Sequence, residues 1–286
     1  MSNSPGPAVR RRQLMAELKR LRDAAALSQA EVADQLSWHA TKVMRLETGR
    51  NAPHPNDVRV MLDLYGVTER ERRDALIQLA KDAKQKGWWY SYRNWLLYRY
   101  DFFIGLESEA SSIWNFELAM IPGLLQTEDY ARAQIRGGPS ELGSDAVERL
   151  VEVRMTRQQV LTREDRPQLW AILDEAAIRR VIGGPAAMRA QLERLAEATD
   201  DGRTTIQVVP YGAGAHPGTL GPFVILGFPE PHEPDLAYME TIGGNLYVDK
   251  PEEVRLYTTA FNHLRAVALS PADTGAMLNA AARELS

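Results

Sequence analysis

Three polar residues in one short segment have side chains suited to hydrogen bonding with a nucleic acid. Thr41, Lys42 and Arg45 stand beside the apolar residues Val43 and Leu46, which recur at helical spacing. A helix that buries the two apolar residues turns the polar side chains outward. A guanidinium can donate two hydrogen bonds to the edge of a guanine, and an ammonium group is attracted to phosphate. The chemistry predicted here is recognition of a polyanion.

The helices that position these residues are indicated by caps and apolar spacing. Residues 9–26 form an amphipathic pattern, and Ser28 with Glu31 is a capping box that starts a second helix. Residues 37–39 interrupt the apolar pattern, and Gly49 closes the next helix as a C-cap. Two helices of about eight residues joined by such a break match a helix-turn-helix. The exposed second helix of that motif fits the major groove of DNA.

Two more helices, over 56–65 and from 68 to about 86, complete a mainly α, five-helix domain at residues 1–86. This segment holds 16 basic and 11 acidic residues, a balance of +5, whereas the rest of the chain holds 18 and 27, a balance of −9. A basic N-terminal segment followed by an acidic remainder of the chain favours contact between residues 1–86 and a polyanion.

Residues 27–50 resemble the XRE family, the Cro- and lambda-repressor-type helix-turn-helix regulators. The matching residues are Leu27-Ser28-Gln29, Val32-Ala33, Val43, Arg45 and Glu47-Thr48-Gly49-Arg50. The resemblance implies that Gln29 contacts a DNA phosphate and that the outer face of the recognition helix reads bases. The DNA-binding residues expected from it are Gln29, His39, Ala40, Thr41, Lys42, Arg45 and Arg50. It also implies a structural ion pair between Arg22 and Glu47.

The chain departs from the family pattern before and within the recognition helix. Ser37-Trp38-His39 replaces the usual Gly-Val-Ser, and Met44 stands where many relatives have Ser. His39 is a weaker N-cap than Ser, and Met44 cannot donate a hydrogen bond. The fold prediction is unaffected, but the bases read cannot be deduced.

Nine of the sixteen residues from 88 to 103 are aromatic. Aromatic rings with Arg93 and Arg99 are compatible with stacking on single-stranded bases. Only two basic residues are interleaved, however, so packing between domains or between protomers is the favoured interpretation.

Residues 87–286 are predicted to form an α+β domain with a small, mostly antiparallel sheet covered by helices. The strand candidates are 168–173, 204–209, 223–228, 236–241 and 245–248, and residues 103–120 are expected to be helical. The segments GWWYSY, IGLESEA, IPGLLQTEDYARA, TTIQVVPYGAGAH, GPFVILGF and YVDKPEEVRLYTTAFNHL resemble a C-terminal domain of unknown function found behind XRE-type heads in many actinobacterial regulators. That resemblance implies a regulator, in some members antitoxin-like, with a small companion protein.

Catalysis is not expected. Asp174 and Glu175 are adjacent, so on a strand they point to opposite faces, and on a helix they form its acidic first turn. The loop around Gly212, Gly214 and His216 lacks the setting of a dinucleotide-binding motif. His216 is retained as a candidate ligand contact, although a glycine-rich connection between strands explains the same pattern. No catalytic residue, metal site or cofactor is predicted.

The chain contains no cysteine and no apolar run of the roughly 18 residues that a membrane span needs. No secretory leader is recognised at the N-terminus, and the cytoplasm is the expected location. The predicted function is a homodimeric, sequence-specific regulator of transcription that binds double-stranded operator DNA. Its C-terminal domain is expected to hold the dimer and to bind a companion protein or a small-molecule effector. The alternatives are an antitoxin-like protein that mainly sequesters a companion protein, a small-molecule-sensing repressor, and an enzyme localised by its head.

Overall fold

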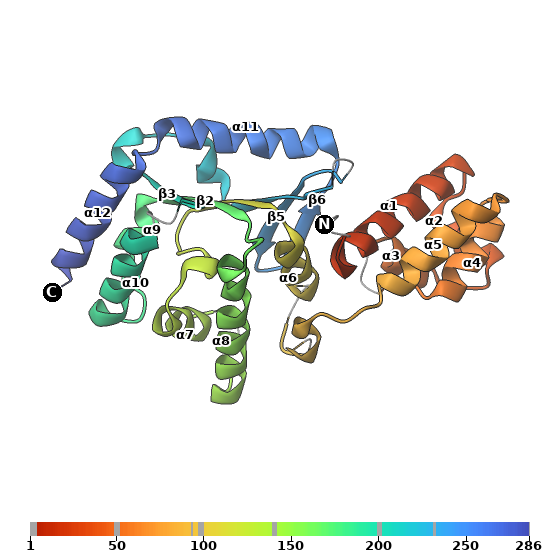
Figure 1. Cartoon of the computed structure of the whole chain (residues 1–286), viewed down its shortest axis with the longest axis horizontal. Coiled ribbons are helices and arrows are strands. Elements are labelled where there is room, and N and C mark those ends of the chain that lie inside the picture. The colour runs from red at the N-terminus through yellow and green to blue at the C-terminus, as the bar shows by residue number, and fades with distance from the viewer. Residues whose placement is uncertain are drawn as a thin grey trace. The chain divides into compact units, whose positions relative to one another are not determined.

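The computed structural model describes residues 5–48, 52–92, 94–96, 100–138, 142–198, 202–230 and 233–285. Its contacts divide the chain into two compact units (Figure 1). The N-terminal unit comprises residues 1–91 and 101–109, and the C-terminal unit comprises residues 92–100 and 110–286. The boundary predicted at residue 86 therefore falls before a segment, 87–91, that belongs with the N-terminal helices.

The N-terminal unit is helical. Its elements are α1 (Pro7–Ala24), α2 (Gln29–Gln35), α3 (Ala40–Glu47), α4 (Pro55–Leu64), α5 (Arg70–Asp82), η1 (Trp88–Tyr92) and most of α6 (Tyr100–Glu109). The predicted capping box is confirmed, because Ser28 Oγ accepts from Glu31 N at 3.2 Å and Glu31 Oε2 accepts from Ser28 N at 2.7 Å. The core gathers Leu14, Leu18, Val32, Val43, Leu46, Val58, Met61, Leu62 and Ala80.

The start of α1 is stabilised by a residue about one hundred positions away. The N-cap, Gly6, has no side chain, and the first turn of α1 contains no acidic residue. Instead, the Glu109 carboxylate at the end of α6 accepts from the amides of Ala8 and Val9 at 2.9 and 2.8 Å. A carboxylate at a helix N-terminus satisfies free amides and interacts favourably with the helix dipole. This contact joins α6 to the N-terminal unit.

The aromatic segment is only partly buried. Phe102 and Phe103 of α6 are buried, whereas Trp88, Tyr90 and Trp95 are each at least 36% exposed. Arg93 and residues 97–99 lie outside the described residues. The two phenylalanines are therefore buried and these three rings are not, and the packing between domains or protomers favoured for residues 88–103 stays a prediction.

The C-terminal unit contains a six-stranded mixed sheet in the order β3-β2-β1-β4-β5-β6. The strands are β1 (Ser112–Glu117), β2 (Gln168–Asp174), β3 (Thr204–Val209), β4 (Phe223–Gly227), β5 (Leu236–Thr241) and β6 (Gly244–Val248). The pairings β1–β4, β4–β5 and β5–β6 are antiparallel, and β1–β2 and β2–β3 are parallel. The prediction of a mostly antiparallel sheet is confirmed.

One strand was not predicted. The prediction of one helix over residues 103–120 is wrong, because α6 ends at Glu109 and residues 112–117 form β1. β1 pairs with β2 on one side and with β4 on the other. Two partners far away in sequence satisfy its backbone, and this long-range pairing decides between helix and strand for a short apolar run.

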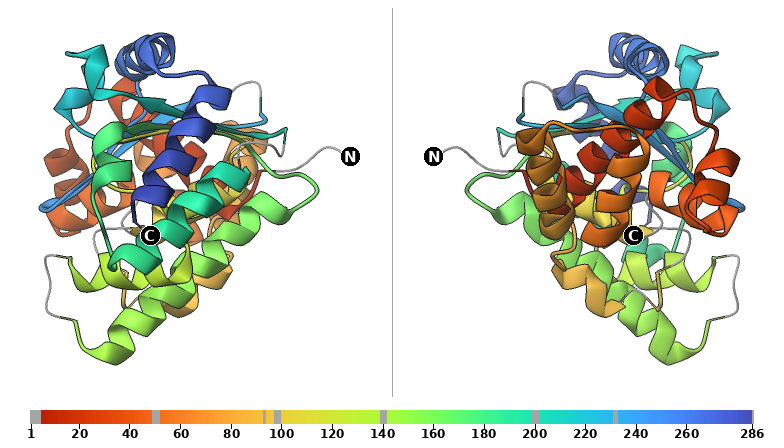
Figure 2. Two further views of the ribbon diagram at one scale, coloured as in Figure 1. Left: turned by 90° about the vertical axis from the view of Figure 1, so that its left-hand side faces the viewer. Right: turned by 90° about the vertical axis from the view of Figure 1, so that its right-hand side faces the viewer.

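Helices cover both faces of this sheet (Figure 2). The remaining elements are α7 (Glu128–Arg136), α8 (Ser144–Gln158), α9 (Glu175–Arg179), α10 (Pro185–Ala198), α11 (Pro251–Val267) and α12 (Pro271–Glu284), with short 3₁₀ turns η2 (Gly123–Leu125), η3 (Gln159–Thr162), η4 (Tyr211–Ala213) and η5 (Pro217–Leu220). α11 packs Val254, Phe261 and Leu264 on one face, whereas α7, α8 and α10 lie on the other. α12 packs along α10.

Candidate nucleic-acid interface

The surface of α3 separates into a buried side and an exposed side. Val43 and Leu46 are buried in the core. Four exposed residues follow one another at spacings of three, one and three; we call Thr41, Met44, Arg45 and Thr48 the outer row of α3. Ala40 is exposed beside them. Residues three and four apart share one helix face, so the outer row is one continuous strip.

Arg45 is the cation of the outer row. Within the described residues no hydrogen bond or ion pair involves its guanidinium, and its side chain is exposed. Its five N–H donors are therefore available to a ligand. A planar guanidinium of this kind matches the N7 and O6 acceptors of guanine.

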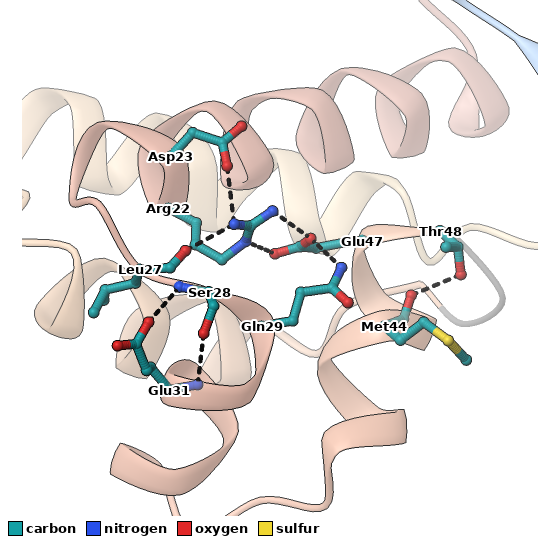
Figure 3. A network of polar contacts seen from close by, with 9 residues as sticks. All are labelled: Arg22, Asp23, Leu27, Ser28, Gln29, Glu31, Met44, Glu47 and Thr48. Atoms are coloured by element: carbon teal, nitrogen blue, oxygen red, sulfur yellow. Dashed lines mark hydrogen bonds and ion pairs between the residues drawn. The ribbon is translucent and has the colours of Figure 1, made fainter.

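A buried ion pair holds the end of α3 against α1 (Figure 3). Arg22 Nε donates to Glu47 Oε1 at 2.6 Å and Arg22 Nη2 donates to Glu47 Oε2 at 3.1 Å. Arg22 Nη1 also donates to the Leu27 carbonyl at 2.8 Å. The hydrogen bonds with Glu47 raise the pKa of the Arg22 guanidinium above its ordinary value. The pair that the family resemblance implies is thus present, and it fixes the helix rather than facing DNA.

Gln29 joins the same network. Its Nε2 donates to Glu47 Oε2 at 2.7 Å, and the side chain is half-buried (Figure 3). A primary amide has two N–H donors. Glu47 therefore holds the amide in place through one N–H. The second N–H is left to donate to a DNA phosphate, the contact that the family resemblance implies.

His39 caps the recognition helix through its ring. Nδ1 accepts from Thr41 N at 3.3 Å and lies 2.8 Å from Thr41 Oγ1. Because Nδ1 acts as the acceptor, the neutral ring carries its proton on Nε2. The imidazole thus replaces the Ser cap of the family, and its Nδ1 also lies within hydrogen-bond distance of the Thr41 hydroxyl.

Lys42 is directed away from the outer row. Its Nζ lies 2.7 Å from Asp57 Oδ1 at the start of α4 and 3.6 Å from the centroid of the Trp38 ring. Trp38, in the turn before α3, packs against the core and donates its backbone N–H to the Ala33 carbonyl at 2.7 Å. The contacts of Lys42 with Asp57 and Trp38 hold α3 against α4. Arg50, the last of the predicted DNA-binding residues, lies outside the described residues.

His216, the candidate ligand contact, is held by a partner that sequence reasoning did not identify. Its Nε2 lies 3.2 Å from Asp174 Oδ2 at the end of β2, and only 5% of its side chain is exposed. The connection from β3 to β4 must cross the ends of β2 and β1, since those strands lie between them. Gly218 rests on Phe116 at the end of β1, where an added Cβ would lie 2.3 Å from the ring. The loop therefore crosses the end of the sheet as a glycine-rich connection between strands, and it buries the His216 side chain against Asp174.

The neighbouring carboxylates have structural partners. Asp174 Oδ1 accepts from Ala176 N at 2.8 Å as the N-cap of α9. Glu175 Oε2 accepts from Tyr211 N at 2.9 Å. Within the described parts of the chain, no group of three or more metal-ligating residues is arranged to hold a metal ion. No helix among the same residues combines the length and apolarity needed to cross a membrane.

Comparison with known proteins gives two family matches. Residues 13–76 match a helix-turn-helix domain, and residues 100–280 match a domain of unknown function, DUF5753. No curated protein and no solved structure matches the chain. The first match runs from Gln13 within α1 to Leu76 within α5, and the second begins at Tyr100, the first residue of α6.

Proposed function

We propose that this chain, which belongs to the DUF5753 family and carries a helix-turn-helix domain, is a sequence-specific regulator of transcription that binds double-stranded DNA. One observation carries the proposal: α3 exposes the outer row, in which Arg45 has no partner among the described residues, while the Arg22–Glu47 pair holds the buried side of the helix. A rigidly held helix with an exposed face is what major-groove recognition requires. The excess of basic residues in the same segment supports association with phosphates.

The finer features of the proposal rest on the resemblance to XRE-type regulators and on general physics. We place the protein in the cytoplasm as a homodimer whose two α3 helices enter successive major grooves, about 34 Å apart, of a roughly palindromic operator. The C-terminal unit would hold the dimer and bind a companion protein or a small-molecule effector. We assign it no catalysis, and the structural partners of Asp174, Glu175 and His216 support that assignment.

The proposal is tested by selecting duplexes from a random library with the full chain and measuring affinity for the selected site. Arg45→Ala should weaken specific binding by at least about fivefold, because a good bidentate base contact contributes roughly 1–3 kcal/mol. Binding to unrelated duplex should fall much less. Failure to enrich any duplex would refute the proposal.

Lys42→Ala is the matched control, since it removes a cation from the same helix. Lys42 is already paired with Asp57, so the slope of log affinity against log salt should change by much less than the one unit expected for a lost phosphate contact. If Arg45→Ala and Thr41→Ala both bind the selected site like the parent, the reading face has been assigned to the wrong residues.

A further inference from the structure

We infer that Met44 determines specificity by contacting the 5-methyl group of a thymine in the operator. The inference rests on the proposed function and names what one part of the interface recognises. It concerns a residue that departs from the family pattern and to which the sequence alone assigned no contact.

The first step is the placement of Met44. Its side chain is 36% exposed, and it lies in the outer row directly beside Arg45. Met61 of the same unit, in contrast, is completely buried in the core. Met44 is absent from the side chains that pack against that core among the described residues. A large apolar side chain therefore occupies the strip that faces outward.

The second step is what the other members of the row can offer. The Thr48 hydroxyl donates to the Met44 carbonyl at 2.7 Å, and the Thr41 hydroxyl is directed to His39 Nδ1 at 2.8 Å. Both hydroxyl groups thus have a hydrogen-bond partner within the unit. Hydrogen-bond donation to bases falls to Arg45, and non-polar contact falls to Met44.

The third step is the chemistry of the major groove. A thioether is a weak acceptor with no donor, so Met44 cannot pair with the polar edges of guanine, adenine or cytosine as the common reading residues do. The apolar group that the groove displays is the thymine methyl. Methionine is flexible and polarisable, which suits contact with a small methyl group. Arg45 and Met44 are adjacent, so the guanine and the thymine should lie close together in one half-site.

The experiment uses the selected duplex and replaces each thymine in turn by uracil, which lacks only the methyl group. For the parent protein, one such replacement in a half-site should lower affinity about fourfold, the effect of removing one buried methyl group. Met44→Ala should bind the thymine and uracil duplexes equally. Alanine favours helix, so the variant should remain folded; its thermal unfolding is recorded alongside.

The matched control is Met120→Ala, which removes a methionine of nearly equal exposure, 37%, in the C-terminal unit. This variant should keep the full difference between thymine and uracil. The inference is overturned if the parent tolerates every uracil, or if Met44→Ala still discriminates, while Arg45→Ala loses the site. If no duplex is enriched, the proposed function itself fails, so the two failures are distinguishable.

Discussion

The two units of this protein each contain a glutamate whose surroundings shift its pKa, and the two shifts have opposite directions. In the N-terminal unit, Glu47 is buried against Arg22, and Glu17 accepts hydrogen bonds from Arg20 and Arg72. In the C-terminal unit, Glu117 at the end of β1 lies in the field of a second carboxylate, Glu240. The neighbouring arginines favour the ionised form of the N-terminal carboxylates, whereas Glu240 disfavours the ionised form of Glu117. Ionisation of Glu17 should therefore stabilise the helical unit, whereas ionisation of Glu117 should destabilise the sheet-bearing unit.

The pKa values show the same contrast. Hydrogen bonding to Arg20, with a further contribution from Arg72, lowers the pKa of Glu17 to about 2. A carboxyl with a lowered folded-state pKa contributes stability above its ordinary pKa near 4.5 and loses it as pH falls toward 2. Burial, reinforced by Glu240, raises the pKa of Glu117 to about 8, against the opposing effect of Arg154. The stability contributed by the protonated Glu117 carboxyl is lost as pH rises.

The largest expected effect tests the ion pair of the N-terminal unit. Glu47→Ala removes the buried partner of the Arg22 guanidinium and leaves it only the exposed Asp23 carboxylate and the Leu27 carbonyl, so the free energy of unfolding should fall by about 3 kcal/mol. Urea unfolding of the full chain, followed by helix ellipticity, measures the loss. In the C-terminal unit, Glu148→Ala removes an exposed partner of Arg132 and should leave no resolvable change. Equal losses in the two variants would contradict the contrast.

A second prediction concerns pH and the C-terminal unit. Because the folded-state pKa of Glu117 is raised, the protein binds its proton more tightly than the unfolded chain does, and stability falls between pH 4.5 and about 8. Glu117→Gln should remove this loss of stability, which is roughly 1–4 kcal/mol. The lower part of the range applies because the side chain is only partly buried. Thermal unfolding at pH 5 and pH 8.5 compares the two proteins. Parallel pH profiles would show that Glu117 ionises without cost.

The smallest effect concerns backbone strain. Among the described residues, the two non-glycine residues with positive φ, Ala26 and Ser37, both lie in the N-terminal unit, at +54° and +53°. Such a conformation costs roughly 1–2 kcal/mol with a side chain present, and glycine recovers part of it. Ser37→Gly should therefore raise the stability by about 0.5–1 kcal/mol, measured as a higher Tm. Gly183→Ala in the C-terminal unit, where φ is +81°, should lower the Tm instead. A Tm for Ser37→Gly at or below that of the parent would show that the turn carries no recoverable strain.

Much of the secondary structure of the N-terminal unit could be predicted from the sequence, because the residues that determine each helix lie close together in the chain. The Ser28–Glu31 capping box lies within four residues, and Val43 and Leu46 mark the buried side of α3 by their spacing alone. The exposed positions Thr41 and Arg45 follow from the same period. Short-range geometry of a helix relates neighbours directly, so residue order is enough to assign its faces.

The orientation of particular side chains was decided by tertiary structure. Lys42 has the spacing of a DNA contact, yet Asp57 and Trp38 hold it against α4. His216 was a candidate ligand contact in a glycine-rich connection between strands, and the crossing from β3 to β4 places it against Asp174. The partners of Lys42 and His216 lie outside the helix or loop that carries each residue. The spacing of apolar residues along the chain contains no information on such pairs.

The sequence by itself determined the helix-turn-helix, its capping, its charge and the face that can meet DNA, because these depend on residues within one or two helical turns. Tertiary structure alone decided that residues 112–117 become the strand β1 and that Glu109 closes the first turn of α1. The physical reason is the same in both cases: the backbone groups involved are satisfied by partners from about 50 to more than 100 residues away, so their state depends on the completed fold.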